Sequence, residues 1–341
     1  MRRAFLMAIT LLLITTSSQS LSSSHKSGLI TAQVHGTFQT LDQEHAPRSQ
    51  RAWQKLMAEI RASGLNLIVI QWLQFDGSPQ NYADQLKAAL NACRSEPLAL
   101  MIGLSLSSTW WSESSLQTGR LKQELSDNIK VANNVASMLR EHPCFIGWYI
   151  PHEAEATGLT EQQHLALLQF YSELSQALKR LTPGKLVSAS GYHQSGQADA
   201  FDAVDWWRNL VETADIDRLY FQDGRGVIRL APVAISDQLI QALAKVLHNH
   251  RTEFWIVIEA FEQVNTGPKD NEFRAIATTP QRLCQQVQQM QSLAVPMIFF
   301  SFADYMRGPT GSRAADLGEH WRRTKGCRLN RTEDDHQDLG R

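Results

Sequence analysis

The feature that most constrains the fold of this chain is a repeated alternation of strand-like and helix-like segments. From residue 28 onward, eight short apolar runs, typical of strands buried in a parallel sheet, are each followed by a helix-like segment. Eight such units in about 300 residues, without a linker, most often close into a barrel. The apolar runs cover residues 29–38, 65–72, 98–105, 145–155, 185–191, 216–221, 254–258 and 295–302.

The alternative to a barrel is an open, doubly wound sheet. That fold often carries a Gly-x-Gly-x-x-Gly turn after its first strand, and this chain has none there. We therefore predict a single α/β domain, a (βα)8 TIM barrel over residues 28–325. Helix signals agree with this reading: Thr160 and Gln163 form a capping box, and Thr279 precedes Pro280 at a helix start.

The two ends of the chain differ from the repeated region. Residues 1–27 begin with Arg2 and Arg3, continue with the apolar run Ala4–Ile14 and end in small polar residues, which predicts a secretory signal peptide. The run is too short for a stable transmembrane anchor, so no membrane span is expected after cleavage. An uncleaved N-terminal anchor is the alternative. Residues 326–341 are predicted to be a polar, disordered tail.

Charge and cysteine content narrow the partners and the compartment. The net charge of −1 and the lack of a basic block argue against a nucleic-acid partner. The four cysteines fit an oxidising compartment, and none are at metal-ligand spacing. Cys284 and Cys327 fall in the last two helical segments and are the favoured disulfide; free buried thiols remain the alternative. We predict an exported protein, periplasmic or extracellular.

Polar and aromatic residues gather where the predicted strands end, which is where TIM barrels place their active sites. Carboxylates, amides and flat rings together suit a sugar, whose hydroxyl groups are hydrogen-bonded and whose C–H faces stack on rings. We therefore expect a carbohydrate substrate. The predicted substrate-binding residues are Gln33, His35, Gln71, Trp72, Trp110, Trp148, His152, Tyr192, Tyr220, Gln222, Asp223, Glu262, Asp304 and Tyr305.

Glycoside hydrolysis requires two carboxyl groups, and Glu153 and Glu259 are the first carboxylates after the fourth and seventh strands. These strands lie on opposite sides of an eight-stranded ring. We expect Glu153 to be the general acid/base and Glu259 the nucleophile. Glu155 or Glu262 could take the place of its neighbour, and the alternative without function is that all four are solvated loop carboxylates.

The histidines and the tryptophans each allow more than one interpretation. His35, His152 and His193 could hold a metal with Glu153 or Asp223, but no metal-binding spacing supports this. No metal and no cofactor is therefore predicted. Among the tryptophans, Trp72, Trp110, Trp111 and Trp148 are candidates for stacking on a sugar. The tryptophans expected to pack inside the protein are Trp53, Trp206, Trp207 and Trp255.

Several segments together resemble one family. They are Gly36–Gln39, Ile70–Trp72, Gly147–Glu153, Phe221–Gly226, Glu259–Glu262 and Phe302–Tyr305. Together they resemble domain-of-unknown-function family 4434, over roughly residues 28–310. That resemblance implies a glycosidase-like barrel of the kind found in exported bacterial proteins.

The family is in turn similar to the clan A glycosidases, which place the acid after strand four and the nucleophile after strand seven. Glu153 and Glu259 match those positions. That clan usually has Asn before the acid, whereas this chain has His152.

We predict an exported glycoside hydrolase that acts on a poly- or oligosaccharide. A carbohydrate-binding barrel without catalytic activity is the main alternative. A metal-dependent hydrolase or deacetylase that uses the three histidines is the weaker one.

Overall fold

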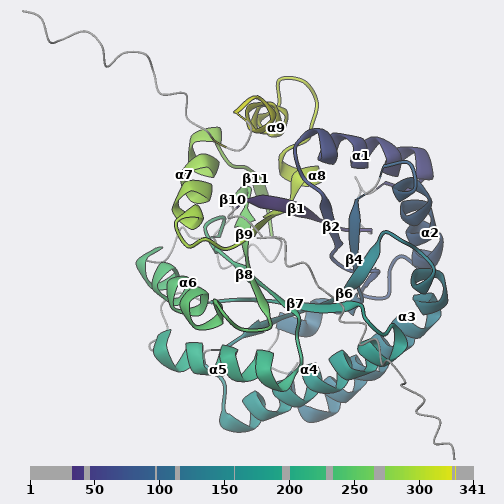
Figure 1. The fold of residues 1–341 in the computed structure, drawn as a ribbon, viewed down its shortest axis with the longest axis vertical. Coiled ribbons are helices and arrows are strands. Elements are labelled where there is room, and N and C mark those ends of the chain that lie inside the picture. Colours follow the sequence, from purple (N-terminus) through teal and green to yellow (C-terminus); the bar gives the residue numbers. More distant parts are fainter. Residues whose placement is uncertain are drawn as a thin grey trace, which may run out of the picture. The chain divides into compact units, whose positions relative to one another are not determined.

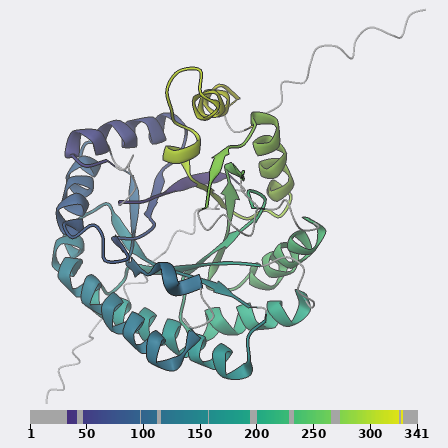
Figure 2. The same cartoon turned by 180° about the vertical axis from the view of Figure 1, so that it is seen from behind.

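The computed structural model describes residues 33–41, 47–96, 98–111, 116–156, 158–193, 200–227, 233–264, 273–324 and 327. The predicted signal peptide, residues 1–27, lies outside the described residues, as does the predicted tail apart from Cys327. The described part of the chain is a closed barrel of parallel strands within a ring of helices, seen from its two sides in Figure 1 and Figure 2. The predicted TIM barrel is confirmed.

The barrel strands follow one another around the ring in chain order, and the first pairs with the last to close it. Each strand is apolar because one side faces the barrel interior and the other faces helices. The strands are β1 (Val34–Gln39), β2 (Leu67–Ile70), β4 (Ala99–Gly103), β6 (Phe145–Glu155), β7 (Leu186–Tyr192), β8 (Arg218–Gln222), β9 (Glu253–Glu259) and β12 (Met297–Phe300).

Helices connect successive strands and form the outer layer (Figure 1). The helix α4 begins with the predicted capping box, in which the Thr160 hydroxyl accepts from the Gln163 N–H and the Gln163 side chain accepts from the Thr160 N–H. The helices are α1 (Gln50–Ala62), α2 (Tyr82–Cys93), α3 (Thr118–Arg140), α4 (Glu161–Leu181), α5 (Ala200–Thr213), α6 (Val233–Leu247), α7 (Pro280–Gln291), α8 (Phe302–Tyr305) and α9 (Arg313–Thr324).

Two small sheets and a short 3-10 helix extend the C-terminal end of the barrel. The strand β3 (Gln74–Phe75) pairs in parallel with β5 (Ser105–Leu106), and β10 (Phe261–Gln263) pairs antiparallel with β11 (Ala275–Ala277). The 3-10 helix η1 (Ser108–Trp111) follows β5. These elements follow β2, β4 and β9, so they build the rim on which polar residues were predicted.

The apolar residues form two clusters. The larger lies between the strands and the helices and contains Trp53, Trp206 and Trp207, as predicted. The smaller fills the barrel interior and contains Trp255, also a predicted packing residue. The remaining buried apolar residues of this cluster are Phe38, Leu67, Val69, Met101, Tyr149, Tyr220, Val257 and Ile298.

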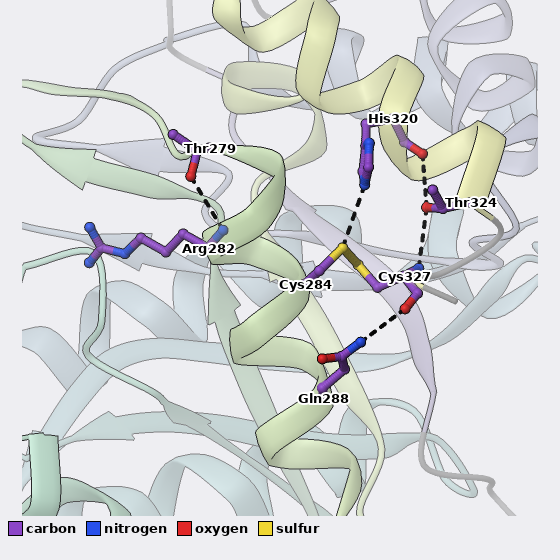
Figure 3. The surroundings of a disulfide bond; sticks show 7 residues. All are labelled: Thr279, Arg282, Cys284, Gln288, His320, Thr324 and Cys327. Carbon is purple, nitrogen blue, oxygen red and sulfur yellow. Dashed lines mark hydrogen bonds between the residues drawn. A yellow bond between two sulfur atoms is a disulfide. The ribbon is translucent and has the colours of Figure 1, made fainter. Parts of the chain in front are cut away.

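Disulfides join all four cysteines. The predicted pair Cys284–Cys327 is confirmed, and it links α7 to the chain that follows α9 (Figure 3). The second pair, Cys93–Cys144, connects the end of α2 to the residue before β6 and was not predicted. Two disulfides are typical of proteins that fold outside the reducing cytosol. Within the described ranges, no helix has the length and apolar character needed to cross a membrane.

Candidate active site

Gln33 and His35 do not lie on the predicted rim. The strand β1 begins at Val34, so both residues lie at the N-terminal end of the barrel, opposite the rim. There the His35 ring packs 5.5 Å from the ring of Trp255, near the start of β9. The prediction was wrong because the strand was expected to start at residue 29, whereas it begins at Val34, and it is Gln39 that ends it.

Two other predicted residues, Trp148 and Tyr220, are buried away from the rim. Trp148 lies between the strands and helices, where its indole N–H donates to the Thr182 hydroxyl at 2.7 Å. Tyr220 is fully buried in the barrel interior, with its hydroxyl 3.3 Å from Arg218. Trp148 was misplaced because its side chain points out of the barrel toward the helices. Tyr220 was misplaced because its side chain packs inside the barrel and does not reach the rim.

His152 also faces outward from the barrel. Its Nε2 lies 3.3 Å from a carboxylate oxygen of Glu124 on α3, and its ring packs against Trp110 and against Phe170 on α4. The side chain has no exposed surface. His152 therefore supports the end of β6 from behind, and the prediction that it binds substrate was wrong. The three histidines do not converge, and the described part of the chain holds no cluster of three potential metal ligands.

Glu153 lies at the C-terminal end of β6 and is held by two N–H groups. One carboxylate oxygen accepts from the Gln222 amide at 2.7 Å, and the other accepts from the Trp111 indole at 3.2 Å. Burial raises the pKa of Glu153, and these two hydrogen bonds oppose the rise. The contacts join the ends of β6 and β8 with η1.

Glu259, the last residue of β9, is buried beside a second carboxyl group. Its Oε2 accepts from the Gly226 N–H at 2.5 Å, and its own N–H donates to Asp223 at 3.3 Å. Burial, followed by repulsion from Asp223, raises the pKa of Glu259 to about 8. Repulsion from Glu153 acts in the same direction, so the two predicted catalytic carboxylates interact electrostatically.

Asp223, a predicted substrate-binding residue, is almost fully buried next to Glu259. It accepts from the N–H groups of Arg225 and Glu259 on one oxygen and from the Gln286 amide, at 3.2 Å, on the other. Burial raises its pKa to about 6, while these donors and the charge of Arg225 oppose the rise. Asp223 therefore acts on Glu259 from within the protein.

Glu262 forms its contacts away from Glu153 and Glu259. Its Oε1 lies 2.9 Å from the Thr278 hydroxyl and 2.9 Å from the Arg313 guanidinium, with Arg282 at 3.4 Å. Burial favours the neutral form, but the hydroxyl and the two cations outweigh it and lower the pKa of Glu262. This contact set connects β10, β11, α7 and α9, so Glu262 stabilises the rim and does not replace Glu259.

Three further predicted residues border the pair of glutamates. Tyr192 ends β7, and after burial the charges of Glu155 and Glu153 raise its pKa. Tyr305 on α8 stacks 5.1 Å from Phe261, and after burial the charges of Asp304 and Glu259 raise its pKa. Asp304 is hydrogen-bonded to Ser301. Glu155 ends β6 next to Glu153, with an oxygen 4.0 Å from the His193 ring.

Aromatic residues line the rim next to Glu153. Trp72 packs 5.0 Å from Phe75, which in turn lies 6.5 Å from Trp111, and Trp111 is 48% exposed. Trp110 is only 5% exposed, with its indole N–H bonded to the Glu153 carbonyl, so it supports the strand end from below. Gln71 follows β2 at the rim and is buried. The exposed surface for stacking is thus offered by Trp111 more than by Trp110.

Two residues of the site were missed in the sequence. Gln286 is 2% exposed on α7, and its amide joins Asp223 to the Glu259 carbonyl. Its position on the apolar stripe of Leu283, Val287 and Met290 was a signal that could have found it. Gly226 lies so close to Glu259 that a Cβ there would come within 2.8 Å of Oε2.

Comparison with known proteins identifies the family. The sequence profile described as Domain of unknown function (DUF4434) matches residues 34–313. The chain belongs to this family. The match covers every barrel strand and both Glu153 and Glu259. A search of curated protein sequences gave no match.

Solved structures share the barrel of this DUF4434 protein at low sequence identity. A "putative alpha-L-fucosidase" from Bacteroides thetaiotaomicron VPI-5482 matches with a TM-score of 0.69 and 16% identity, over 86% of this chain and 96% of that one. A beta-galactosidase from the psychrophilic Marinomonas ef1 gives 0.58 and 10%, over 86% of this chain and 59% of that one. An endo-1,4-beta-mannanase from Eisenia fetida matches with a TM-score of 0.51 and 13% identity, over 86% of this chain and 91% of that one. The shared feature is a glycosidase-like TIM barrel.

Proposed function

We propose that this DUF4434 protein is an exported glycoside hydrolase that cleaves glycosidic bonds in a poly- or oligosaccharide. The observation that carries the proposal is the pair Glu153 and Glu259, which lie at the C-terminal ends of β6 and β9 on the same rim, where the charge of Glu153 contributes to the raised pKa of Glu259. Hydrolysis of a glycosidic bond requires one carboxylic acid to protonate the leaving oxygen and one carboxylate to attack the sugar or activate water.

The residues around the pair support a sugar as the ligand. Trp111 offers an exposed indole face next to Glu153, and Trp72 and Phe75 continue the aromatic surface away from it. Tyr192 and Gln222 place hydrogen-bonding groups at the ends of β7 and β8, and Tyr305 places one on α8, which follows β12. Aromatic faces combined with amides and hydroxyls bind the two faces and the edges of a sugar ring.

The test is a screen of bacterial surface and storage polysaccharides with the wild type, Glu153→Gln and Glu259→Gln. Release of reducing ends by the wild type should fall by about 100-fold or more in each variant, as expected for loss of a group that transfers a proton or attacks the sugar. Glu262→Gln is the matched control, because Glu262 is a rim glutamate held by Arg282 and Arg313. Full activity of either Glu153→Gln or Glu259→Gln on a cleaved substrate would refute the assignment.

A carbohydrate-binding barrel without catalytic activity is the second candidate, and the aromatic surface of Trp72, Phe75 and Trp111 favours it. This candidate predicts calorimetric binding of a glycan that survives intact after prolonged incubation. Binding should then be lost in Trp111→Ala and retained in Glu259→Gln. Release of reducing ends by the wild type alone would decide for the enzyme.

Export is proposed from the residues 1–27 and from the two disulfides. The full chain expressed in a Gram-negative host should appear in the periplasmic fraction with residues 1–27 removed. Mass spectrometry of the recovered protein checks both the cleavage and the two disulfides. Recovery of the intact chain in the cytoplasmic fraction would contradict the proposal.

A further inference from the structure

Three carboxyl groups meet at the site, and the contacts distinguish them. We infer that Asp223 is a positioning residue that keeps a proton on Glu259, so that Glu259 is the proton donor and Glu153 the ionised carboxylate. This inference rests on the proposed hydrolase function and gives the two glutamates roles opposite to those that their strand positions imply. It is carried by what each carboxyl group touches.

Glu153 is surrounded as an ionised carboxylate would be. Each of its oxygens accepts one N–H, from Gln222 at 2.7 Å and from Trp111 at 3.2 Å. The Trp111 indole N–H can only donate, and the Gln222 amide donates in its present orientation, so both contacts suit an ionised Glu153. Hydrogen bonds to both oxygens favour the charged form.

Asp223 is the better stabilised member of the buried pair. It accepts three N–H groups, from Arg225, Glu259 and Gln286, and the Arg225 side chain lies 4.0 Å away. Among the described residues, Glu259 receives backbone donors only, from Gly226 and Val227. Because both groups are buried and adjacent, they do not ionise together easily, and the proton stays on the less stabilised Glu259.

The charged groups that face Glu259 add to this asymmetry. Asp223 after β8 and Glu153 on β6 are both negative, and Tyr305 on α8 is neutral. Among the described residues, Arg225 is the cation that lies against Asp223, and it pairs with Asp237 on α6 at 2.6 Å. Gln286 on α7 is neutral, and Arg282 on the same helix is directed to Glu262 and to the Arg225 carbonyl. Burial and the neighbouring carboxylates thus raise the pKa of Glu259 above that of Asp223.

The chemistry balances with Glu259 as the acid. Its proton passes to the glycosidic oxygen as the bond from that oxygen to the anomeric carbon breaks, and the leaving sugar departs as an alcohol. With retention, Glu153 forms an ester to the anomeric carbon, water then displaces it, and the proton of the water returns to Glu259. With inversion, Glu153 removes a proton from the attacking water.

Aryl glycosides separate the two roles. A 2,4-dinitrophenyl group can leave as the anion without help from an acid, whereas an unsubstituted phenyl group needs a proton on its oxygen as it leaves. We would measure 2,4-dinitrophenyl and phenyl glycosides of fucose, galactose, glucose, mannose and xylose. Glu259→Gln should lose about 100-fold on the phenyl glycoside and less than about 10-fold on the dinitrophenyl glycoside, while Glu153→Gln loses about 1000-fold on both. The reverse pattern would overturn the inference and leave the hydrolase function standing.

The protonation itself can be measured without a substrate. Carbon-13 NMR of side-chain carboxyl groups, assigned with Glu153→Gln and Glu259→Gln, follows each titration directly. In Asp223→Asn the Glu259 pKa should fall by one unit or more, and in an active enzyme the alkaline limb of the kcat/KM profile should shift with it. An unchanged Glu259 pKa, or a Glu153 pKa above that of Glu259, would overturn the inference even if no tested glycoside is cleaved.

Discussion

The two ends of the barrel differ in how their buried charged groups are compensated. At the N-terminal end, Arg218 is 7% exposed and pairs with Glu253 at 2.6 Å while its guanidinium stacks 4.2 Å from the Trp255 ring. At the C-terminal end, Asp223 and Glu259 are buried side by side, and Arg225 lies 4.0 Å from Asp223 while its guanidinium is hydrogen-bonded to Asp237. The N-terminal end therefore pairs its buried cation with an anion, whereas the C-terminal end places two carboxyl groups next to each other.

This difference indicates which end stabilises the fold and which end performs chemistry. A paired cation filling the bottom of the barrel contributes cohesion, and its loss leaves a cavity and an unpaired partner. Adjacent carboxylates cost stability because one must stay neutral, but that cost supplies an acid that is protonated near neutral pH. The same division is general for TIM barrels, whose N-terminal face serves stability.

The largest effect that would test this contrast is expected at Arg218. We expect Arg218→Met to lower the free energy of unfolding by about 3 kcal/mol, because it removes a buried guanidinium that pairs with the partly exposed Glu253 and packs on the Trp255 ring. Urea unfolding followed by tryptophan fluorescence measures this change. Arg208→Met is the control: Arg208 forms an exposed pair with Asp205, so its loss should cost less than about 1 kcal/mol. An equal cost in both variants would mean that the N-terminal end is not a stability centre.

Glu259→Gln should act in the opposite direction. Since the folded protein holds the proton of Glu259 up to about pH 8 and the unfolded chain releases it above about pH 4.5, wild-type stability falls between these values. The glutamine variant lacks this loss, so it should match the wild type at pH 5 and exceed it by about 2 kcal/mol at pH 9. Thermal unfolding across this range checks the sign. A variant that is less stable than the wild type at pH 9 would contradict the raised pKa.

An intermediate effect is expected at Gln286. Gln286→Leu removes the amide that donates to Asp223 and to the Glu259 carbonyl, which leaves buried acceptors without that donor. We expect a cost of about 1–2 kcal/mol. Gln289→Leu, an exposed position on the same helix, is the control. If both variants unfold alike, the amide does not support the carboxyl pair.

The smallest effect is expected at Glu262, three residues after Glu259. Its lowered pKa means that the ion pairs contribute stability above about pH 4.5, and this contribution is lost as the pH falls through the folded pKa. Glu262→Gln should therefore cost less than about 1 kcal/mol at pH 7, and progressively less as the pH falls below about 4.5. If the stability difference between Glu262→Gln and the wild type changed with pH in the same direction as that of Glu259→Gln, the two glutamates would not differ as described.

Much of the architecture could be read from local patterns. A buried parallel strand must be apolar on both faces, and a helix that covers it must carry an apolar stripe, so eight units were visible along the chain. The Thr160 and Thr279 caps and the disulfide Cys284–Cys327 were also predicted. The placement of Glu153 and Glu259 at strand ends followed from counting these units.

The face to which each side chain points could not be read in this way. Neighbouring residues of β6 face opposite sides, and the pairing of β6 with β7 is irregular between Ile150 and Ala154, so Glu153 reaches the rim while His152 faces Glu124. Gln33 and His35 were misplaced for a related reason, since the run of apolar residues does not mark where pairing begins.

The sequence by itself determined the barrel and the two strand ends that carry glutamates, because both depend on periodicity along the chain. Only the tertiary structure decided what surrounds those glutamates. Asp223, Gly226 and Gln286 come from two other elements and meet Glu259 only when the barrel closes. Burial and like charge are properties of that assembled neighbourhood, and they make Glu259 differ from Glu153.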